Sequence, residues 1–364
     1  MSETKSKNVK SSDRDTKKLD HFDTVSVRKY EKIDKIGKGQ YGVVCRYRGI
    51  NRKSGEIVAL KKVLMGNERN GFPLTSIREI QILRRLNHPN IVTLKEITVG
   101  EKPDSVFLVF EYCSHDFASL VDQMPEPFKP QQIKCIMLQL LSALDHLHKN
   151  FILHRDLKPA NLLITSEGLL KIADFGLARI FGNPLQPYTP CVVTPGYRAP
   201  ELLLGCKTYH TAIDMWATGC MLGEFFLNEP LIQGSSELDQ IRLIFELLGT
   251  PKEKIWPGLR ELDVSKFMLQ FRECKESTLR EKLGHTTTEE GLDLLQKMLL
   301  YDPCTRITAE KALLHPYFQE SPKAITPYMM PKFPSRRSIQ SKGKKRDISA
   351  ISKVPQRVGK RQAV

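Results

Sequence analysis

The hydrophobic pattern of the chain changes near Tyr112, and this change constrains the fold more than any other feature of the sequence. Before Tyr112, short runs rich in β-branched and aromatic residues alternate with polar segments, as is typical of strands. These runs are YEKIDKIG, YGVVCRYRG, IVALKKV, IVTLKEI and SVFLVFEY. Between the third and the fourth, Ile77, Ile80 and Leu83 fall at helical spacing. The first part of the chain is therefore predicted to form a small sheet with one helix.

After Tyr112 the pattern becomes mainly helical. In residues 131–150, apolar side chains repeat at the spacing that places them along one stripe of a helix. They are Ile133, Ile136, Met137, Leu140, Leu141, Leu144 and Leu147. Further helices are expected over 211–227, 236–248, 288–299 and 308–314. The predicted class is α+β, with a small β-rich lobe over about 30–112 and a larger, mainly helical lobe over about 113–320.

The two ends of the chain differ from the rest in composition. Residues 1–29 and 321–364 lack the apolar content of a folded core, and we expect both to be disordered. The net charge of +15 also belongs mainly to the ends, because residues 332–364 contain eleven basic residues and one acidic residue. The segment RRSIQSKGKKR in this basic tail has the two clusters typical of a nuclear address. We therefore expect a nuclear protein, leave a cytoplasmic pool open, and expect no direct binding of nucleic acid.

The sequence carries no sign of a membrane segment or of disulfides. No apolar run approaches the roughly 18 residues of a membrane span, and the first fifteen residues contain no apolar signal core. The eight cysteines include no CxxC pair, which indicates reduced thiols instead of a disulfide framework or a zinc site. We therefore expect a soluble, intracellular protein without a membrane partner.

Two motifs in the β-rich part suggest contact with phosphate. Gly37, Gly39 and Gly42 lie between two predicted strands, where glycine lets backbone N–H groups approach phosphate oxygens. An ordinary hairpin turn is the alternative, whereas a dinucleotide-binding fold is excluded because a strand and not a helix follows the glycines. Lys61 follows the apolar residues VAL of the third strand, and a buried ammonium needs an anion. Glu79 is its expected protein partner and phosphate its expected ligand.

The helical part contains a dense polar motif, HRDLKPAN, at residues 154–161. Asp156, Lys158 and Asn161 place an acid, a cation and an amide close together. Each of them alone is explained as well by an ion pair or a cap of structural value only. Together with the glycine motif, the strand lysine, the helix glutamate and the later DFG and APE, they stand in the order of the protein-kinase signatures. Over about 30–320 the chain resembles a eukaryotic protein kinase, a bilobal fold with ATP between its lobes.

The resemblance implies a phosphoryl transfer in which positioning and charge neutralisation supply most of the catalysis. Asp156 would accept the proton of the substrate hydroxyl, and Lys158 would neutralise the γ-phosphate. Asn161 and Asp174 would hold Mg²⁺ through oxygen atoms. The lysine of DLKPAN resembles the serine/threonine branch of the family.

The resemblance also implies which residues surround ATP. Lys61 would bind the α- and β-phosphates beneath the glycine loop, with Glu79 holding it in place. Backbone groups of Glu111 and Cys113 would face the adenine, with Phe110 behind them. The apolar residues expected above and below the base are Ile36, Val44, Ala59 and Leu163. Without the resemblance, these four residues would be explained equally well as core.

Three segments are similar to those of the cyclin-dependent kinases: PLTSIRE, LLGTPKEKIWPG and DFGLARIFGNPLQPYTPCVVT. The similarity implies that a cyclin docks on the PLTSIRE helix and presses it inward, so that Glu79 pairs with Lys61. YCSHDFASL and MMPKFP favour the PISSLRE type of this family, which pairs with a cyclin of the M type. GFPLTSIREI and PYTPCVVT favour the PITSLRE type, the alternative, which pairs with a cyclin of the L type.

The same similarity implies control by phosphorylation. Thr189 would be phosphorylated, and Arg78, Arg155 and Arg179 would converge on its phosphate. Tyr41 in the glycine loop would be an inhibitory phosphorylation site. Any one of these arginines alone would be explained better as a surface charge.

Two questions stay open at the level of sequence. Pro195 and Gly196 stand where these kinases usually have Leu-Trp, which leaves the expected preference for Ser/Thr-Pro substrates in doubt. A catalytically silent scaffold that binds a cyclin is the alternative to an active kinase. We favour the active kinase because every catalytic position carries the expected residue.

Overall fold

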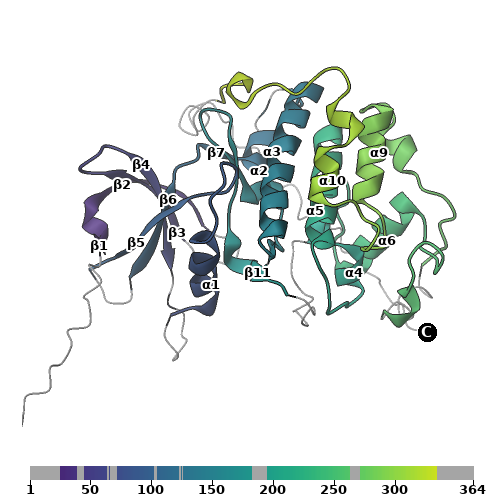
Figure 1. The fold of residues 1–364 in the computed structure, drawn as a ribbon, viewed down its shortest axis with the longest axis horizontal. Helices are drawn as coiled ribbons and strands as arrows, with labels where there is room; N and C mark the ends of the chain where they lie inside the picture. The colour runs from purple at the N-terminus through teal and green to yellow at the C-terminus, as the bar shows by residue number, and fades with distance from the viewer. Residues whose placement is uncertain are drawn as a thin grey trace, which may run out of the picture. The chain divides into compact units, whose positions relative to one another are not determined.

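The computed structural model describes residues 25–38, 45–63, 65, 72–101, 105–122, 124, 126–182, 195–262 and 271–333. The chain divides into two compact units. Unit 1 contains residues 1–80 and 93–112, and unit 2 contains residues 81–92 and 113–364. The described part of unit 1 is β-rich and that of unit 2 is mainly helical, as Figure 1 shows, so the predicted α+β class is confirmed.

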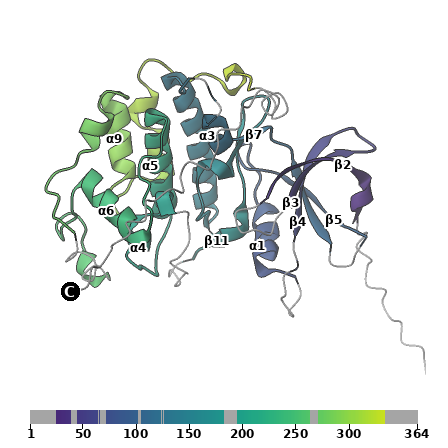
Figure 2. The ribbon, with the colours of Figure 1, turned by 180° about the vertical axis from the view of Figure 1, so that it is seen from behind.

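Unit 1 is built on a six-stranded sheet in the order β1-β5-β6-β4-β3-β2. Its strands are β1 (Val25–Ser26), β2 (Tyr30–Lys38), β3 (Cys45–Asn51), β4 (Ile57–Val63), β5 (Leu94–Val99) and β6 (Val106–Glu111). Strand β1 pairs parallel with β5, and the other neighbours pair antiparallel. The predicted helix is α1 (Leu74–Leu83), which Figure 2 shows from behind. Tyr30, Val58, Leu60 and Val109 form the buried core on one face of the sheet.

The sheet extends further toward the N-terminus than the sequence predicted. Residues 25–29, which we assigned to a disordered tail, form β1 and the short 3₁₀ helix η1 (Val27–Lys29). Val25 pairs with Thr98, and Lys29 Nζ lies 3.0 Å from a carboxylate oxygen of Glu96. A strand of two residues is too short to produce a hydrophobic period, so the sequence pattern could not reveal it.

Unit 2 is organised around α5, whose residues from Ala212 to Phe225 are all buried. Helices α3 (Pro130–Lys149) and α9 (Glu289–Met298) pack on either side of α5 (Ala212–Leu227), as Figures 1 and 2 show. The other α-helices described are α2 (Phe117–Val121), α4 (Pro200–Leu203), α6 (Glu237–Leu248), α8 (Leu279–Leu283) and α10 (Ala309–Leu313). The helices expected over 211–227, 236–248, 288–299 and 308–314 are therefore all present as α5, α6, α9 and α10.

Short strands hold the loops of unit 2 that carry the conspicuous motifs. Strands β7 (His115–Asp116), β9 (Leu162–Ile164) and β10 (Leu170–Ile172) form one sheet, and β8 (Ile152–Leu153) pairs with β11 (Arg179–Ile180). The motif HRDLKPAN connects β8 to β9, and DFG follows β10. The 3₁₀ helix η2 (Pro159–Asn161) lies between β8 and β9, η3 (Phe175–Leu177) lies between β10 and β11, and η4 (Pro195–Tyr197) follows β11.

Part of the expected C-terminal tail packs against unit 2. Residues 321–333 include η7 (Pro327–Met329) and the buried Met330. Lys134 of α3, which is almost fully buried, donates to the carbonyl oxygen of Pro322 (3.0 Å) and to Glu320 Oε1 (3.3 Å). A buried ammonium requires such acceptors, which explains why the chain is held here. Within the described residues, no helix has the length and apolar character needed to cross a membrane.

Candidate active site

In unit 1, Lys61 and Glu79 form a close ion pair. Lys61 lies in β4, next to Leu108 of β6, and Glu79 lies on α1. Lys61 Nζ is 2.7 and 2.8 Å from the two carboxylate oxygens of Glu79. The side chains are only 13% and 3% exposed, so each buried charge stabilises the other. Glu79 is thus the partner that the apolar neighbours of Lys61 indicated.

In unit 2, the polar residues of HRDLKPAN bind one another around Asp156. The Asp156 side chain is almost completely buried. Lys158 Nζ lies 2.9 Å from Asp156 Oδ2. Asn161 Nδ2 donates to the backbone oxygen of Asp156 (2.7 Å) and to its Oδ2 (2.9 Å). These bonds fix the carboxylate of Asp156, and they make Oδ1 the atom through which Asn161 can accept a hydrogen bond or bind a cation.

The loop before Asp156 is anchored by Asp214, a fully buried acid near the start of α5. Its two carboxylate oxygens accept the backbone N–H groups of His154 and Arg155, each at 3.0 Å. His148 of α3 lies 3.1 Å from the same carboxylate. Burial works to raise the pKa of Asp214, but the hydrogen bond and charge of His148, with the charge of His154, hold it below its usual value. Asp214 therefore stays ionised and fixes the backbone of the loop.

Arg155 connects this loop to two other segments. Its backbone has a φ of 67°, a conformation that costs a non-glycine residue energy. Its guanidinium donates to the Leu177 carbonyl (2.8 Å) and to the Tyr209 hydroxyl (2.6 Å). The hydrogen bonds that Arg155 donates to Asp214, Leu177 and Tyr209 offset the energy cost of its backbone conformation and hold it in place.

Asp174 lies beside the loop of Asn161. Its backbone is left-handed, with φ 67° and ψ 71°, at the start of η3. The preceding residue, Ala173, donates its N–H to the Asn161 carbonyl (2.9 Å). The following residue, Phe175, is fully buried, with its ring edge-on to His154 at 4.9 Å. These contacts bring the Asp174 segment next to Asn161, as two residues that share a cation require.

The residues expected around ATP in unit 1 lie on three strands. Ile36 and Gly37 are in β2, Ala59 is in β4, and Phe110 and Glu111 are in β6. Ala59 and Phe110 are direct neighbours across β4 and β6. Ile36 and Ala59 are half-buried, whereas Phe110 is buried. Unit 1 thus brings Ala59 and Phe110 together and keeps Ala59 on a partly open surface.

Other predicted residues of the ATP site are in unit 2 or outside the described residues. Cys113 is half-buried and follows β6. Leu163 is half-buried between the buried Leu162 and Ile164 of β9, so it points away from the core. Gly39, Tyr41, Gly42 and Val44 lie outside the described residues.

The three arginines expected around a phosphate occupy different elements. Arg78 is half-buried on α1 of unit 1. In unit 2, the pairing of β11 with β8 places Arg179 opposite Leu153, two residues before Arg155. Thr189 lies outside the described residues, so the convergence of the arginines on it stays a prediction.

Sequence reasoning missed two features that hold the loops of the candidate site: the buried Asp214 and the ion pair of Glu201 with Arg306. Asp214 had one signal, an acid within the strongly apolar stretch AIDMWATGCMLGEFFL, which indicates a buried charge. Glu201 of APE forms a two-pronged ion pair with Arg306, at 2.7 and 3.0 Å, and both side chains are buried. The pair joins residues 105 positions apart, and no local pattern signals it.

Taken together, the described catalytic positions carry a fixed carboxylate, an adjacent ammonium, and two oxygen donors suited to a hard cation. This set can orient a hydroxyl nucleophile and stabilise negative charge on a phosphoryl group. The residues of unit 2 thus fit phosphoryl transfer by themselves. In unit 1, Lys61, held by Glu79, is a separate ammonium suited to phosphate oxygens.

Comparison with known proteins identifies the class. A family model described as "Protein kinase domain" matches residues 30–318, and the chain belongs to the protein kinase family. Within it the chain is 51% identical over 314 residues to cyclin-dependent kinase 10 of Homo sapiens, with 86% of each chain covered. It is 50% identical over 315 residues to cyclin-dependent kinase 11B of Rattus norvegicus, covering 86% of this chain and 72% of the relative. The chain is therefore a member of the cyclin-dependent kinase family.

The relatives include both types that the sequence suggested: cyclin-dependent kinase 10 is the PISSLRE type, and cyclin-dependent kinase 11 is the PITSLRE type. A relative described as "Probable cyclin-dependent kinase 10" of Dictyostelium discoideum is 50% identical over 324 residues, with 88% of each chain covered. Cyclin-dependent kinase 11A of Homo sapiens is also 50% identical, although the chain spans only 40% of its length. Identity alone therefore does not separate the two types.

Proposed function

We propose that this chain transfers the γ-phosphate of ATP to serine or threonine hydroxyls of proteins and that a cyclin activates it. The observation that carries the proposal is the Asp156 cluster, in which Lys158 and Asn161 both bind the carboxylate. A silent scaffold has no need of a catalytic acid held in one orientation. The identity of about 50% to cyclin-dependent kinases over most of the chain supports the same reaction.

In the proposed reaction, Asp156 accepts the proton of the substrate hydroxyl while that oxygen attacks the γ-phosphate. Asn161 keeps the carboxylate oriented, and Lys158 stabilises the charge that develops on the transferred group. Lys61 holds the other phosphates, and Glu79 keeps Lys61 from turning away. Asp214 acts on Asp156 only through the backbone of the loop.

The donor set at Asn161 and Asp174 fits Mg²⁺, because both residues offer oxygen atoms and magnesium prefers oxygen ligands. Asn161 would bind through Oδ1, since its Nδ2 donates to Asp156. When bound, the ion would neutralise phosphate charge. We propose Mg²⁺ as the metal cofactor on this chemistry.

The decisive test is the Asp156→Asn variant of the full chain, assayed with radiolabelled ATP and a protein substrate in the presence of an M-type or an L-type cyclin. We expect incorporation to fall at least about 100-fold, the lower end of what a proton acceptor contributes. Asp145→Asn is the matched control, because Asp145 forms a surface pair with Lys149 on α3. Equal incorporation by wild type and Asp156→Asn would refute the proposal.

We propose that the cyclin docks on α1, the PLTSIRE helix. Leu74 at the start of α1 is 65% exposed and Thr75 is exposed, so this end of the helix offers an apolar contact. Docking would stabilise the pair of Glu79 with Lys61. Leu74→Asp should weaken cyclin binding in a pulldown, whereas the exposed Leu314→Asp, on unit 2, should not. The cyclin recovered would also distinguish the M type from the L type.

We propose a preference for Ser/Thr-Pro substrates, although Pro195 and Gly196 depart from the usual Leu-Trp. Arg198 is buried and pairs with Glu237. At Gly196, a Cβ atom would lie 3.2 Å from the Ile232 backbone oxygen, so the segment is tightly packed where it differs. A peptide array with the cyclin complex tests the proposal, and a lack of proline enrichment after the phosphorylated residue would overturn it.

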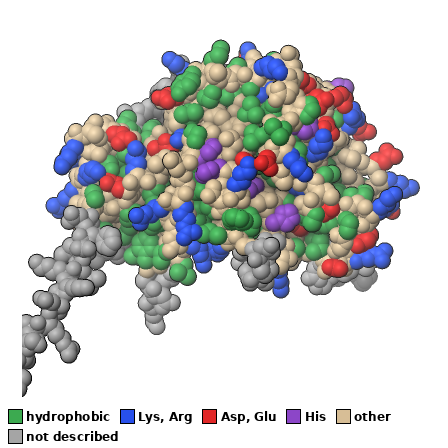
Figure 3. Space-filling model, in the orientation of Figure 1, with side chains coloured by type: hydrophobic (Ala, Val, Ile, Leu, Met, Phe, Trp, Pro, Cys, Tyr) green, Lys and Arg blue, Asp and Glu red, His purple; other side chains and the backbone are tan. Residues whose placement is uncertain are grey.

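We also propose nuclear localisation through residues 336–346, with Thr189 and Tyr41 as phosphorylation sites. Both proposals concern segments outside the described residues and rest on the sequence. On the face that Figure 3 shows, acidic and basic side chains are interspersed, which supports the proposal that this face does not bind nucleic acid. Deletion of 336–346 should reduce the nuclear fraction, and an unchanged fraction would refute the address.

A further inference from the structure

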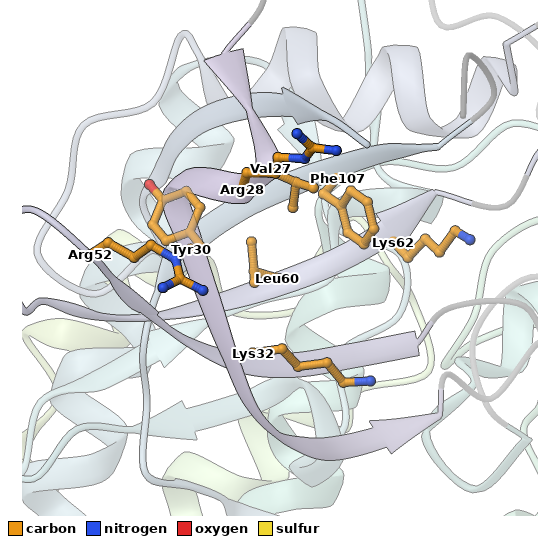
Figure 4. A pocket seen from close by; sticks show the side chains of 8 residues that line it. All are labelled: Val27, Arg28, Tyr30, Lys32, Arg52, Leu60, Lys62 and Phe107. Atoms are coloured by element: carbon orange, nitrogen blue, oxygen red, sulfur yellow. The ribbon is translucent and has the colours of Figure 1, made fainter. Parts of the chain in front are cut away.

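A pocket of about 600 Å³ opens on the face of the unit 1 sheet that is turned away from Lys61. Leu60 and Lys62 line it, and side chains alternate along β4, so Lys61 points to the opposite face. Figure 4 shows Leu60 between the rings of Tyr30 and Phe107, which together make an apolar floor. The pocket is therefore separate from the catalytic residues.

The floor is fixed by its own packing. Leu60 and Tyr30 belong to the core cluster of the sheet, and Phe107 packs against that cluster. A Cβ atom at Gly49 would lie 2.8 Å from Leu60 Cδ1, so the backbone of β3 supports Leu60 from beside it. The Tyr30 hydroxyl donates to Glu96 (2.5 Å), which holds the ring in position. The floor thus presents a preformed apolar surface.

Four basic residues surround this floor: Arg28, Lys32, Arg52 and Lys62 (Figure 4). Arg28 pairs with Glu101 (2.8 Å), but both side chains are more than 70% exposed. Arg52 lies 3.5 Å from Glu31, and both are 59% exposed. Such exposed pairs add little to stability, so another carboxylate can replace the present one. An apolar floor with a basic rim is complementary to an acidic segment that carries an aromatic side chain.

The chain itself contains such a segment immediately before β1. Residues 19–23 read LDHFD, with Phe22 between Asp20 and Asp23. No other stretch outside the described residues combines two acids with an aromatic residue over so short a length. Four residues lie between Phe22 and Val27, which lines the pocket, so these two residues can be at most about 18 Å apart. The segment is therefore tethered within reach of the pocket.

We propose that residues 19–23 fold back onto the outer face of unit 1, with Phe22 in the pocket and its flanking aspartates paired with the basic rim. A short tether makes this docking intramolecular, so modest contact energy suffices to hold the segment. Lys62, whose Nζ lies 6.0 Å from the Phe107 ring centre, stands over the floor and is the cation most suited to Asp20 or Asp23.

The test places the photo-crosslinking residue p-benzoylphenylalanine at position 22 of the full chain, followed by mass spectrometry. We expect crosslinks within the same chain to residues 27–32, 60–62 or 107. The same crosslinker at Val9, in the same N-terminal stretch, is the control and should give no preferred product. Crosslinks spread over both units, or crosslinks between two copies that grow with concentration, would overturn the proposal.

Charge variants test the role of the rim. Lys62→Glu should lower the yield of the position-22 crosslink at least fivefold, and Asp20→Lys with Asp23→Lys in the Lys62→Glu chain should restore it. Lys53→Glu is the matched control, because Lys53 is exposed nearby and does not line the pocket. Thermal unfolding of each variant shows whether it is folded. An undiminished yield in folded Lys62→Glu would refute the pairing.

Discussion

Lys61 shows how one residue can serve both stability and function. Its ammonium is largely removed from water, and Glu79, which is more deeply buried, contacts it through both oxygens. The ammonium that we propose to bind a nucleotide is thus also a charge that needs its partner in the folded state. A substitution at either residue should therefore change stability as well as activity.

Lys61→Met should lower the free energy of unfolding by about 3 kcal/mol, because it leaves the Glu79 carboxylate buried beside an apolar chain. The double variant Lys61→Met with Glu79→Leu should regain much of that loss and remain inactive. Urea unfolding of the two variants and of wild type measures the difference. If the single and double variants were equally stable, the two charges would not be coupled.

At the scale of elements, the loop that carries Asp156 is held by helix α5. Asp214 on α5 binds the loop backbone at His154 and Arg155, and His148 of α3 completes the contact. The pKa of Asp214 lies below its usual value, so the folded state favours the ionised form. The stabilisation is therefore present above the unfolded pKa of about 4 and is lost as the pH falls through the lower folded pKa.

Asp214→Asn should lower the free energy of unfolding near neutral pH by about 3 kcal/mol, because two backbone donors lose a charged acceptor. The difference in unfolding free energy between wild type and variant should begin to narrow below about pH 4, where the unfolded state takes up a proton. It should vanish only below the lower folded pKa, where the folded wild type also loses the charge. Denaturant unfolding across pH measures this gap. Asp145→Asn serves as the control and should show little effect, and a gap independent of pH would contradict the role of the ionised carboxylate.

At the scale of the whole molecule, the folded part continues beyond the helices of the kinase family match. Residues 321–333 supply a carbonyl to the buried Lys134 and place Met330 in a buried position. The backbone of Ile325 also donates to the Gln131 carbonyl of α3. This stretch therefore belongs to the fold of unit 2, and its Ile325, Met330 and Phe333 distinguish it from the basic tail that follows.

Removal of residues 321–364 should lower the melting temperature by about 5 °C, since Lys134 loses an acceptor and Met330 its burial, each contributing about 1–3 kcal/mol. Removal of residues 334–364 alone is the matched truncation and should leave the melting temperature unchanged. Differential scanning calorimetry of the full chain and of both truncated chains measures the three melting temperatures. Equal melting temperatures would show that residues 321–333 add nothing to stability.

The sequence predicted features that repeat locally and missed those made by distant partners. The period of residues 131–150 revealed α3, and the apolar neighbours of Lys61 indicated a buried charge. In contrast, Asp214 meets partners about 60 positions away, and Arg306 meets Glu201 across 105 positions. The left-handed backbone of Asp174 stands before the buried Phe175, and no local pattern indicates that conformation. The sequence could therefore propose candidate site residues, whereas the contacts that hold them could not be predicted.

The attachment of the catalytic loop to α5 has a consequence for hydrogen exchange. The amide protons of His154 and Arg155 face a carboxylate of α5, whose residues 212–225 are all buried. We expect them to meet deuterated solvent only when that helix separates from the loop, so that their exchange reports the global opening of unit 2. We also expect the exchange rate of these two amides to be the same with and without nucleotide turnover.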